Sequence, residues 1–155
     1  MIYIVEGDLL DYNGKVDIIV NAWNINFIPH RLLVTHGVSK RIKEVSGLKP
    51  FDEVQKHGFL KLGEAVLTGP GELNCKGIIH IAGIDIFWNS SEKATRASAR
   101  NIVRLMSEHN FSSIAVPLLG CGANKLDEGR CIEILLEELK SIEEKEVYIV
   151  RYKLN

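Results

Sequence analysis

Polar side chains follow two apolar runs of the chain, at the places where the runs end. Gly7-Asp8 comes after the first run, and Asn21 and Asn24 come after the β-branched run 16–20. A carboxylate accepts hydrogen bonds from ligand amino groups, and amides pair with ligand hydroxyl groups. Each residue also has a purely structural interpretation, because Asp8 could cap a turn and Asn21 could tie a loop to its strand. The residue types alone leave both interpretations open.

A glycine-rich stretch follows a third apolar run. Residues 113–117 (SIAVP) lead into residues 118–124 (LLGCGAN). Glycines after a buried strand let backbone N–H groups approach a phosphate closely, although the stretch has neither the Walker lysine spacing nor GxGxxG. Cys121 is a candidate nucleophile, but no neighbouring histidine or lysine pattern would activate its thiol. The stretch is therefore a weak phosphate motif by itself and gives little support to a cysteine nucleophile.

Strands and helices alternate along the chain and place these residues at strand ends. Several of the apolar runs have no polar face, which is typical of strands covered on both sides. The pattern predicts a single α/β domain over residues 1–155 with a mostly parallel central sheet. Ligands bind beyond the carboxyl ends of such sheets, so the strand-end residues should converge on one cleft. The expected strands are 3–5, 16–20, 63–68, 77–82, 113–117 and 146–152, and the expected helices are 37–47, 50–58, 91–109 and 127–144.

Composition and charge are those of an ordinary globular protein. The 155 residues are 46% hydrophobic and 25% charged with a net charge of -1, which gives no support to binding of nucleic acid or an anionic membrane. No apolar run approaches the ~20 residues of a membrane span, and the first residues, MIYIVEGDLL, lack the features of a signal peptide. Cys75, Cys121 and Cys131 form no CxxC pair, and the histidines form no zinc motif. We therefore expect reduced thiols, no metal or cofactor, no membrane partner and a cytoplasmic location.

Five segments of the chain match a known family in order and spacing. They are GDLL (7–10), VDIIVNAWN (16–24), GVSKRIKEVSG (37–47), GEAVLTGPGEL with GIIHIAGI (63–84) and SSIAVPLLGCGANKL (112–126). VNAxN after a buried strand, with GD before it and P-x-x-G-x-G after it, is a specific combination. On these segments nearly the whole chain resembles the macro domain, a module that binds ADP-ribose. The resemblance implies a three-layer α/β/α sandwich around a mixed sheet of six strands.

The resemblance assigns a part of the ligand to each segment. Asp8 would accept a hydrogen bond from the adenine amino group, with the Leu9 backbone beside it. Asn24 would face the distal ribose, residues 37–39 would lie along the diphosphate, and residues 119–124 would close over the phosphates and the distal ribose. The implied ligand site consists of Gly7, Asp8, Leu9, Ala22, Asn24, Gly37, Val38, Ser39, Pro117, Leu119, Gly120, Cys121, Gly122, Ala123 and Asn124.

Four of the residues bear on catalysis. In the branch of the family that releases ADP-ribose from acidic residues, the first loop reads roughly GGGVDGAIH; here it reads THGVSKRIK, with Ser39 in place of the Asp that positions water. A second branch acts on ADP-ribosyl esters and ADP-ribosylated nucleobases through a helix lysine and an Asp in the second loop. Lys43 matches that lysine, whereas Asn124 stands at the Asp position. A solvated lysine at position 43 and a helix-capping serine at position 39 remain structural alternatives. The resemblance thus implies Asn24, Ser39, Lys43 and Asn124 as catalytic candidates.

Residues 25–35 (INFIPHRLLVT) differ from the family, which has a glycine-rich connector there. We call this stretch the 25–35 segment. It could cover the distal ribose or contact a partner, with Arg31 as a candidate phosphate contact. Trp23, just before it, is expected in the core.

The resemblance implies that the protein binds ADP-ribose or an ADP-ribosylated macromolecule, with nucleic acid entering only as a modified substrate. We expect it to hydrolyse ADP-ribosyl linkages on modified protein or nucleic acid. The main alternative is a binding module without turnover, which Ser39 and Asn124 favour. Phosphatase action on ADP-ribose 1″-phosphate and a different nucleotide ligand also remain open.

Overall fold

The protein contains six strands, four α-helices and two short 3₁₀ helices in the computed structural model, which describes residues 1–33, 35, 37–84, 90–120 and 127–153. The strands are β1 (Ile2–Gly7), β2 (Ile18–Asn24), β3 (Ala65–Thr68), β4 (Gly77–Ile84), β5 (Ser113–Pro117) and β6 (Glu146–Tyr152). The helices are α1 (Gly37–Ser46), α2 (Lys49–Gln55), α3 (Glu92–Glu108) and α4 (Glu128–Leu139), with the 3₁₀ helices η1 (Leu9–Tyr12) and η2 (Lys140–Ile142).

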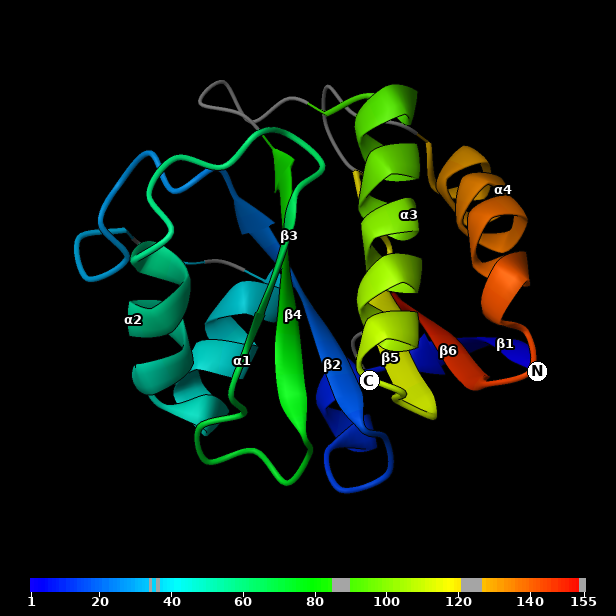
Figure 1. The fold of residues 1–155 in the computed structure, drawn as a ribbon, viewed down its shortest axis with the longest axis horizontal. Helices are drawn as coiled ribbons and strands as arrows, with labels where there is room; N and C mark the ends of the chain where they lie inside the picture. Colours follow the sequence, from blue (N-terminus) through cyan, green and yellow to red (C-terminus); the bar gives the residue numbers. More distant parts are fainter. Residues whose placement is uncertain (34, 36, 85–89, 121–126, 154–155) are drawn as a thin grey trace.

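The strands form one sheet in the order β1-β6-β5-β2-β4-β3. Every neighbouring pair is parallel except β3 and β4, which are antiparallel. Helices α1 and α2 pack on one face of the sheet, and α3 and α4 pack on the other (Figure 1). This arrangement confirms the predicted three-layer α/β sandwich with a mixed, mostly parallel sheet.

Strand β2 is apolar on both faces because it lies between two cores. Ile18 and Val20 belong to the core cluster that includes α3 and α4, whereas Ile19 belongs to the cluster that includes α1 and α2. All three side chains are fully buried. Trp23 is also buried, which confirms its expected place in the core.

The two amides lie inside β2, so the expectation that they follow the strand was wrong. Asn21 is in register with His80 on β4, and its Nδ2 lies 2.9 Å from the Nδ1 atom of that imidazole. The other ring nitrogen of His80 lies 2.9 Å from Thr68 Oγ1 on β3. A buried amide is tolerated in the middle of a strand when a neighbouring strand supplies a partner. Asn21 therefore links β2 to β4 within the sheet and does not hold a loop in place.

Side-chain caps fix where α3 and α4 begin. Ser91 Oγ accepts a hydrogen bond from Ala94 N at the start of α3, and Asp127 caps α4 in the same way. The helix expected over residues 127–144 is shorter than that, because α4 ends at Leu139 and continues only as η2. Within the described part of the chain, none of the helices has the length and apolar character needed to cross a membrane.

Candidate functional site

The carboxyl ends of four neighbouring parallel strands, β1, β6, β5 and β2, meet at one edge of the sheet. A cavity of about 200 Å³ opens at this edge, between η1, α1 and the ends of β5 and β6. It brings together three residues expected in the ligand site, Leu9, Val38 and Pro117. The lining also includes Leu118, from the glycine-rich stretch, and four residues that sequence reasoning did not identify: Glu128, Val150, Arg151 and Tyr152. The wall is largely apolar, as in most small-ligand sites.

Asp8 stands directly before the cavity residue Leu9 and has two hydrogen-bonding partners. Its Oδ1 atom accepts a hydrogen bond from Leu10 N at 2.9 Å and caps η1. Its Oδ2 atom accepts one from Arg41 Nη2 of α1, also at 2.9 Å. The capping interpretation of Asp8 is therefore confirmed. Each carboxylate oxygen can accept more than one hydrogen bond, so capping leaves acceptor capacity for a ligand.

The first turn of α1 offers backbone donors beside the cavity. Gly37, Val38 and Ser39 form this turn, and the first N–H groups of a helix have no partner within the helix. Such groups bind anions favourably. Ser39 is buried, and its Oγ atom has no hydrogen-bond partner among the described residues. A buried hydroxyl without a partner is destabilising, so a bound ligand or water would relieve it.

The loop after β5 begins with residues fixed to the core. The side chain of Leu119 is buried between the helices α3 and α4, and its carbonyl oxygen accepts hydrogen bonds from Cys131 Sγ at 2.6 Å and Thr95 Oγ1 at 3.3 Å. Gly120 has φ +78°, and a Cβ atom there would lie 2.5 Å from Thr95 Oγ1. Only glycine fits this position without strain. Cys121, Gly122, Ala123 and Asn124, expected in this loop, lie outside the described residues.

The end of β2 is less open to a ligand than expected. Asn24 is buried, and its Oδ1 atom accepts a hydrogen bond from Asn26 N at 2.7 Å. Its Nδ2 group has no partner within the described part of the chain. The side chain of Ala22 packs against the core on the α3 and α4 side. Of the two residues, only Asn24 presents a polar group that a ligand could use. Gly7, at the end of β1, contributes only backbone.

Asn26 ties the 25–35 segment to α2 and was missed from the sequence. Its Oδ1 atom accepts a hydrogen bond from Trp23 Nε1 at 2.6 Å. Its Nδ2 group donates to the carbonyl oxygens of Val54 and Gly58, both at 2.9 Å. Its backbone is left-handed, with φ 61°, a conformation that asparagine tolerates better than most residues. In the sequence, the feature from which this anchoring role could have been inferred is an asparagine two positions after VNAxN.

Lys43 is half-buried and does not lie free in solvent. Its ammonium group donates a hydrogen bond to the backbone carbonyl of His30 at 2.7 Å and lies 5.4 Å from the centre of the Phe51 ring. Burial lowers the pKa of Lys43 below its ordinary value, and the charge of Arg31 lowers it further, whereas Asp52 opposes the decrease. A lowered pKa increases the fraction of neutral amine, which is the nucleophilic form.

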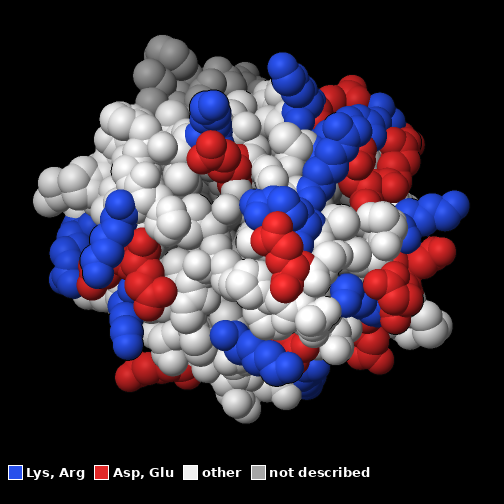
Figure 2. All heavy atoms as spheres, in the orientation of Figure 1, with Lys and Arg blue, Asp and Glu red and all other residues white. Residues whose placement is uncertain are grey.

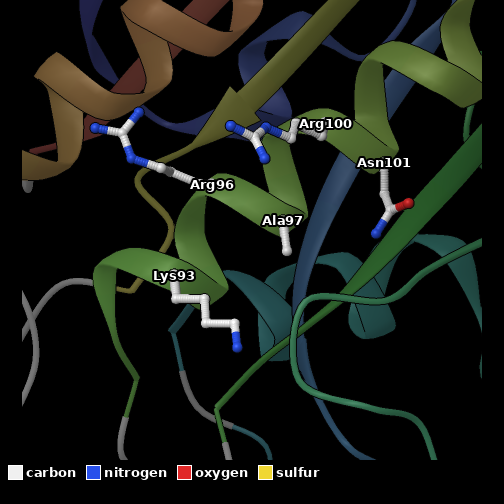
Figure 3. Close-up of a pocket in the computed structure, with 5 residues that line it drawn as sticks. All are labelled: Lys93, Arg96, Ala97, Arg100 and Asn101. Carbon is white, nitrogen blue, oxygen red and sulfur yellow. The ribbon is translucent and has the colours of Figure 1, made fainter.

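A second hollow, of about 600 Å³, lies along α3. It is lined by Lys93, Arg96, Ala97, Arg100 and Asn101 (Figure 3). Arg96 points towards α4, where it pairs with Glu137 at 2.7 Å and Glu138 at 3.1 Å, and Arg100 pairs with Glu138 at 2.9 Å. Basic and acidic side chains are interspersed over this face (Figure 2). Because its arginines are already paired, we do not regard the hollow as an anion site.

Comparison with known proteins identifies the family. The family model described as "Macro domain" matches residues 20–135. A macro domain-containing protein of Caldanaerobacter subterraneus is 31% identical, over 99% of this chain and 87% of that protein. A protein of Salmonella newport named O-acetyl-ADP-ribose deacetylase is 28% identical, over 97% of this chain and 80% of that protein. A crystal structure of the Trypanosoma brucei macrodomain in complex with ADP-ribose has a TM-score of 0.81 at 22% identity, over 98% of this chain and 64% of that one.

The match to the family model extends over more than half of the chain, and the structural likeness agrees with it. The chain belongs to the macro domain family.

Proposed function

We propose that the protein binds ADP-ribose at the carboxyl edge of the sheet and hydrolyses ADP-ribosyl linkages. The observation that carries the proposal is the cavity that places Leu9, Val38 and Pro117 side by side, next to Asp8. An apolar pocket beside a carboxylate suits an adenine ring with an exocyclic amino group. The Trypanosoma brucei macrodomain, which shares this fold, was crystallised in complex with ADP-ribose, and this supports the same choice of ligand.

The remainder of the ligand would extend from the cavity along α1. Its diphosphate would accept hydrogen bonds from the first N–H groups of α1 and from Ser39 Oγ, which has no partner among the described residues. The distal ribose would then reach Asn24 and Lys43. Ribose hydroxyl groups pair well with an amide donor such as Asn24 Nδ2.

Turnover would use the Lys43 amine as the nucleophile. The amine nitrogen would bond to the anomeric carbon of the distal ribose while the bond from that carbon to the leaving group breaks, and the amine proton would pass to the leaving group. Water would then hydrolyse the adduct, which releases ADP-ribose and restores the amine. The name of the Salmonella relative, O-acetyl-ADP-ribose deacetylase, supports a hydrolase. The alternative, a binding module, is favoured by Ser39 and Asn124.

Calorimetric titration with ADP-ribose tests the binding part of the proposal. Asp8→Asn keeps the oxygen that caps η1 but loses the negative charge, so it should weaken ADP-ribose binding by roughly tenfold or more. Asp11→Asn makes the same charge change inside the 3₁₀ helix that Asp8 caps and keeps an oxygen that can accept from Asp8 N; this matched control should bind like the parent protein. Equal affinities for the parent protein and Asp8→Asn would contradict the placement of adenine.

A turnover assay separates an enzyme from a binding module. The substrate is a protein ADP-ribosylated on acidic residues, whose carboxylate is the leaving group at the anomeric carbon, and release of ADP-ribose is measured. Lys43→Arg keeps the positive charge but removes the nucleophile, whereas Lys40→Arg makes the same change at an exposed position of α1. Loss of turnover in Lys43→Arg alone supports the lysine mechanism. No turnover by the parent protein, with binding intact, would favour the binding module.

A further inference from the structure

His30 is the point at which the 25–35 segment meets both α1 and α2. Its ring Nε2 atom lies 2.6 Å from Asp52 Oδ1, and its backbone N–H donates to Gln55 Oε1 at 2.9 Å. Both partners belong to α2. Its carbonyl oxygen accepts the hydrogen bond from Lys43 of α1. Because His30 is buried and bonded at ring, amide and carbonyl, the position of this carbonyl is fixed by α2.

Asp52 also binds the next residue of the segment. Arg31 Nη2 lies 3.1 Å from Asp52 Oδ2, while Asp52 Oδ1 faces His30. One carboxylate thus binds two consecutive side chains of the segment. We call His30, Arg31 and Asp52 the clasp. The side chain of Arg31 is 62% exposed, so the arginine forms the outer part of the clasp and His30 the inner part.

The clasp surrounds the Lys43 amine with a defined set of charges. Among the described residues, Arg31 and Asp52 are the charged groups that act on the amine from outside its own helix, in opposite directions. The rings of His30 and His80 both pack on Phe51, at centroid distances of 6.0 and 5.5 Å. Burial lowers the pKa of His80 to about 3, so this imidazole is neutral near pH 7. The neighbours on α1 itself, Lys40 and Glu44, are solvent-exposed.

We propose that His30, Arg31 and Asp52 are positioning residues for Lys43. The clasp fixes the His30 carbonyl, which orients the Lys43 amine, and the clasp also sets the charge around that amine. The inference rests on the proposed function only for the identity of the substrate, because the orientation and reactivity of the amine can be measured without ligand. It also gives the 25–35 segment a role, which is to connect α2 to the amine of α1.

The reactivity of the free protein gives the first test. Acetic anhydride acylates neutral amines, and mass spectrometry of peptides gives the rate at Lys43 and at Lys40 as the pH is varied. Lys40 is the internal control because it is exposed on the same helix. Lys43 should reach half of its maximal rate at a lower pH than Lys40. Arg31→Ala should lower the Lys43 rate near neutral pH by roughly threefold, the size expected for removing one solvent-exposed charge, and Arg31→Lys should restore it.

Glu53→Gln is the control for a charge change close to the clasp in sequence but outside it. Glu53 neighbours Asp52 in sequence but accepts its hydrogen bond from Gly69 N, outside the clasp. Glu53→Gln should therefore leave the acylation rate of Lys43 unchanged. Identical pH profiles for Lys43 and Lys40, or a Lys43 rate that does not respond to Arg31→Ala, would overturn the proposal. If Arg31 instead contacted only the phosphate of the ligand, its replacement would change affinity and leave this ligand-free profile unchanged.

Trapping with free ADP-ribose gives the second test. The amine condenses with the aldehyde form of the distal ribose to an imine and releases water, and added borohydride reduces the imine to a stable secondary amine. At saturating ADP-ribose, His30→Ala should reduce the yield of adduct at Lys43 at every pH, since the ring that fixes the carbonyl is lost. Arg31→Ala, which changes an exposed side chain, should reduce the yield of adduct near neutral pH, and the yield should recover at higher pH.

The two proposals can fail separately. If ADP-ribose does not bind but acylation shows the expected difference between Lys43 and Lys40, the clasp stands and the proposed function does not. If ADP-ribose binds and acylation shows no difference, the clasp is refuted while binding stands. An unchanged adduct yield in both His30→Ala and Arg31→Ala would refute the clasp as well.

Discussion

The acid stability of this protein should depend on His80. Its imidazole is fully buried between Asn21 and Thr68. An amide nitrogen only donates, so Nδ1 of the ring accepts from Asn21 and the proton sits on Nε2, facing Thr68 Oγ1. Thr68 in turn donates to the carbonyl of Gly69 at 3.0 Å. The neutral ring fits this chain of hydrogen bonds, and burial lowers its pKa from 6.5 to about 3.

The sign and size of the pH effect on stability follow from the linkage between proton binding at His80 and unfolding. As the pH falls below 6.5, the unfolded chain binds a proton at His80, whereas the folded protein does not until about pH 3. The free energy of unfolding therefore falls with decreasing pH in this range, by about 1.4 kcal/mol per pH unit. Between pH 6.5 and 5 the contribution of His80 is about 2 kcal/mol.

Urea unfolding at pH 7 and pH 5 measures this contribution. His80→Gln can accept from Asn21 and donate to Thr68 but does not titrate, so its loss of stability between the two pH values should be smaller by about 2 kcal/mol. His109→Gln, which changes an exposed histidine, should lose as much stability as the parent protein. The reasoning would be refuted if His80→Gln and the parent protein had the same pH dependence.

Two other substitutions test the anchors of the site. Asn26→Ala should lower the free energy of unfolding by about 1–3 kcal/mol, because it leaves the buried Trp23 Nε1 without this partner and removes the hydrogen bonds to the carbonyl oxygens of Val54 and Gly58; a change below about 0.5 kcal/mol in urea unfolding would contradict this role. Gly120→Ala should be more destabilising than Gly37→Ala in thermal unfolding, because both glycines have positive φ but only the Cβ atom at position 120 would clash with Thr95. Equal effects would show that the loop relaxes around the new methyl group.

The sequence predicted the sheet and helices well because local patterns determine them. The continuous apolar run of Ile18, Ile19 and Val20 indicates a strand between two cores, and β2 has that place. The same reasoning placed the end of this strand at Val20, whereas β2 continues to Asn24. Polar Asn21 looked like the beginning of a loop, since its partner His80 is distant in sequence and only pairing of β2 with β4 brings them together.

Prediction of the site was limited by contacts between distant segments. The resemblance to the macro domain implied Leu9, Val38 and Pro117 as site residues, and all three line the cavity. The local spacing of Lys43 suggested a solvated side chain as readily as a nucleophile. Its hydrogen bond to the carbonyl of His30 depends on how the 25–35 segment docks on α2, and a sequence pattern carries no signal for such docking.

Chemical-shift mapping by NMR spectroscopy would show most directly where ADP-ribose binds. Backbone amides of the uniformly ¹⁵N-labelled protein are followed while ADP-ribose is added. The largest changes should occur at Leu9, at Gly37 to Ser39 and at Gly120, around the cavity at the carboxyl edge of the sheet. Changes confined to the α3 hollow, at Lys93, Arg96 and Arg100, would contradict this site, and the absence of any change at millimolar ligand would contradict ADP-ribose binding itself.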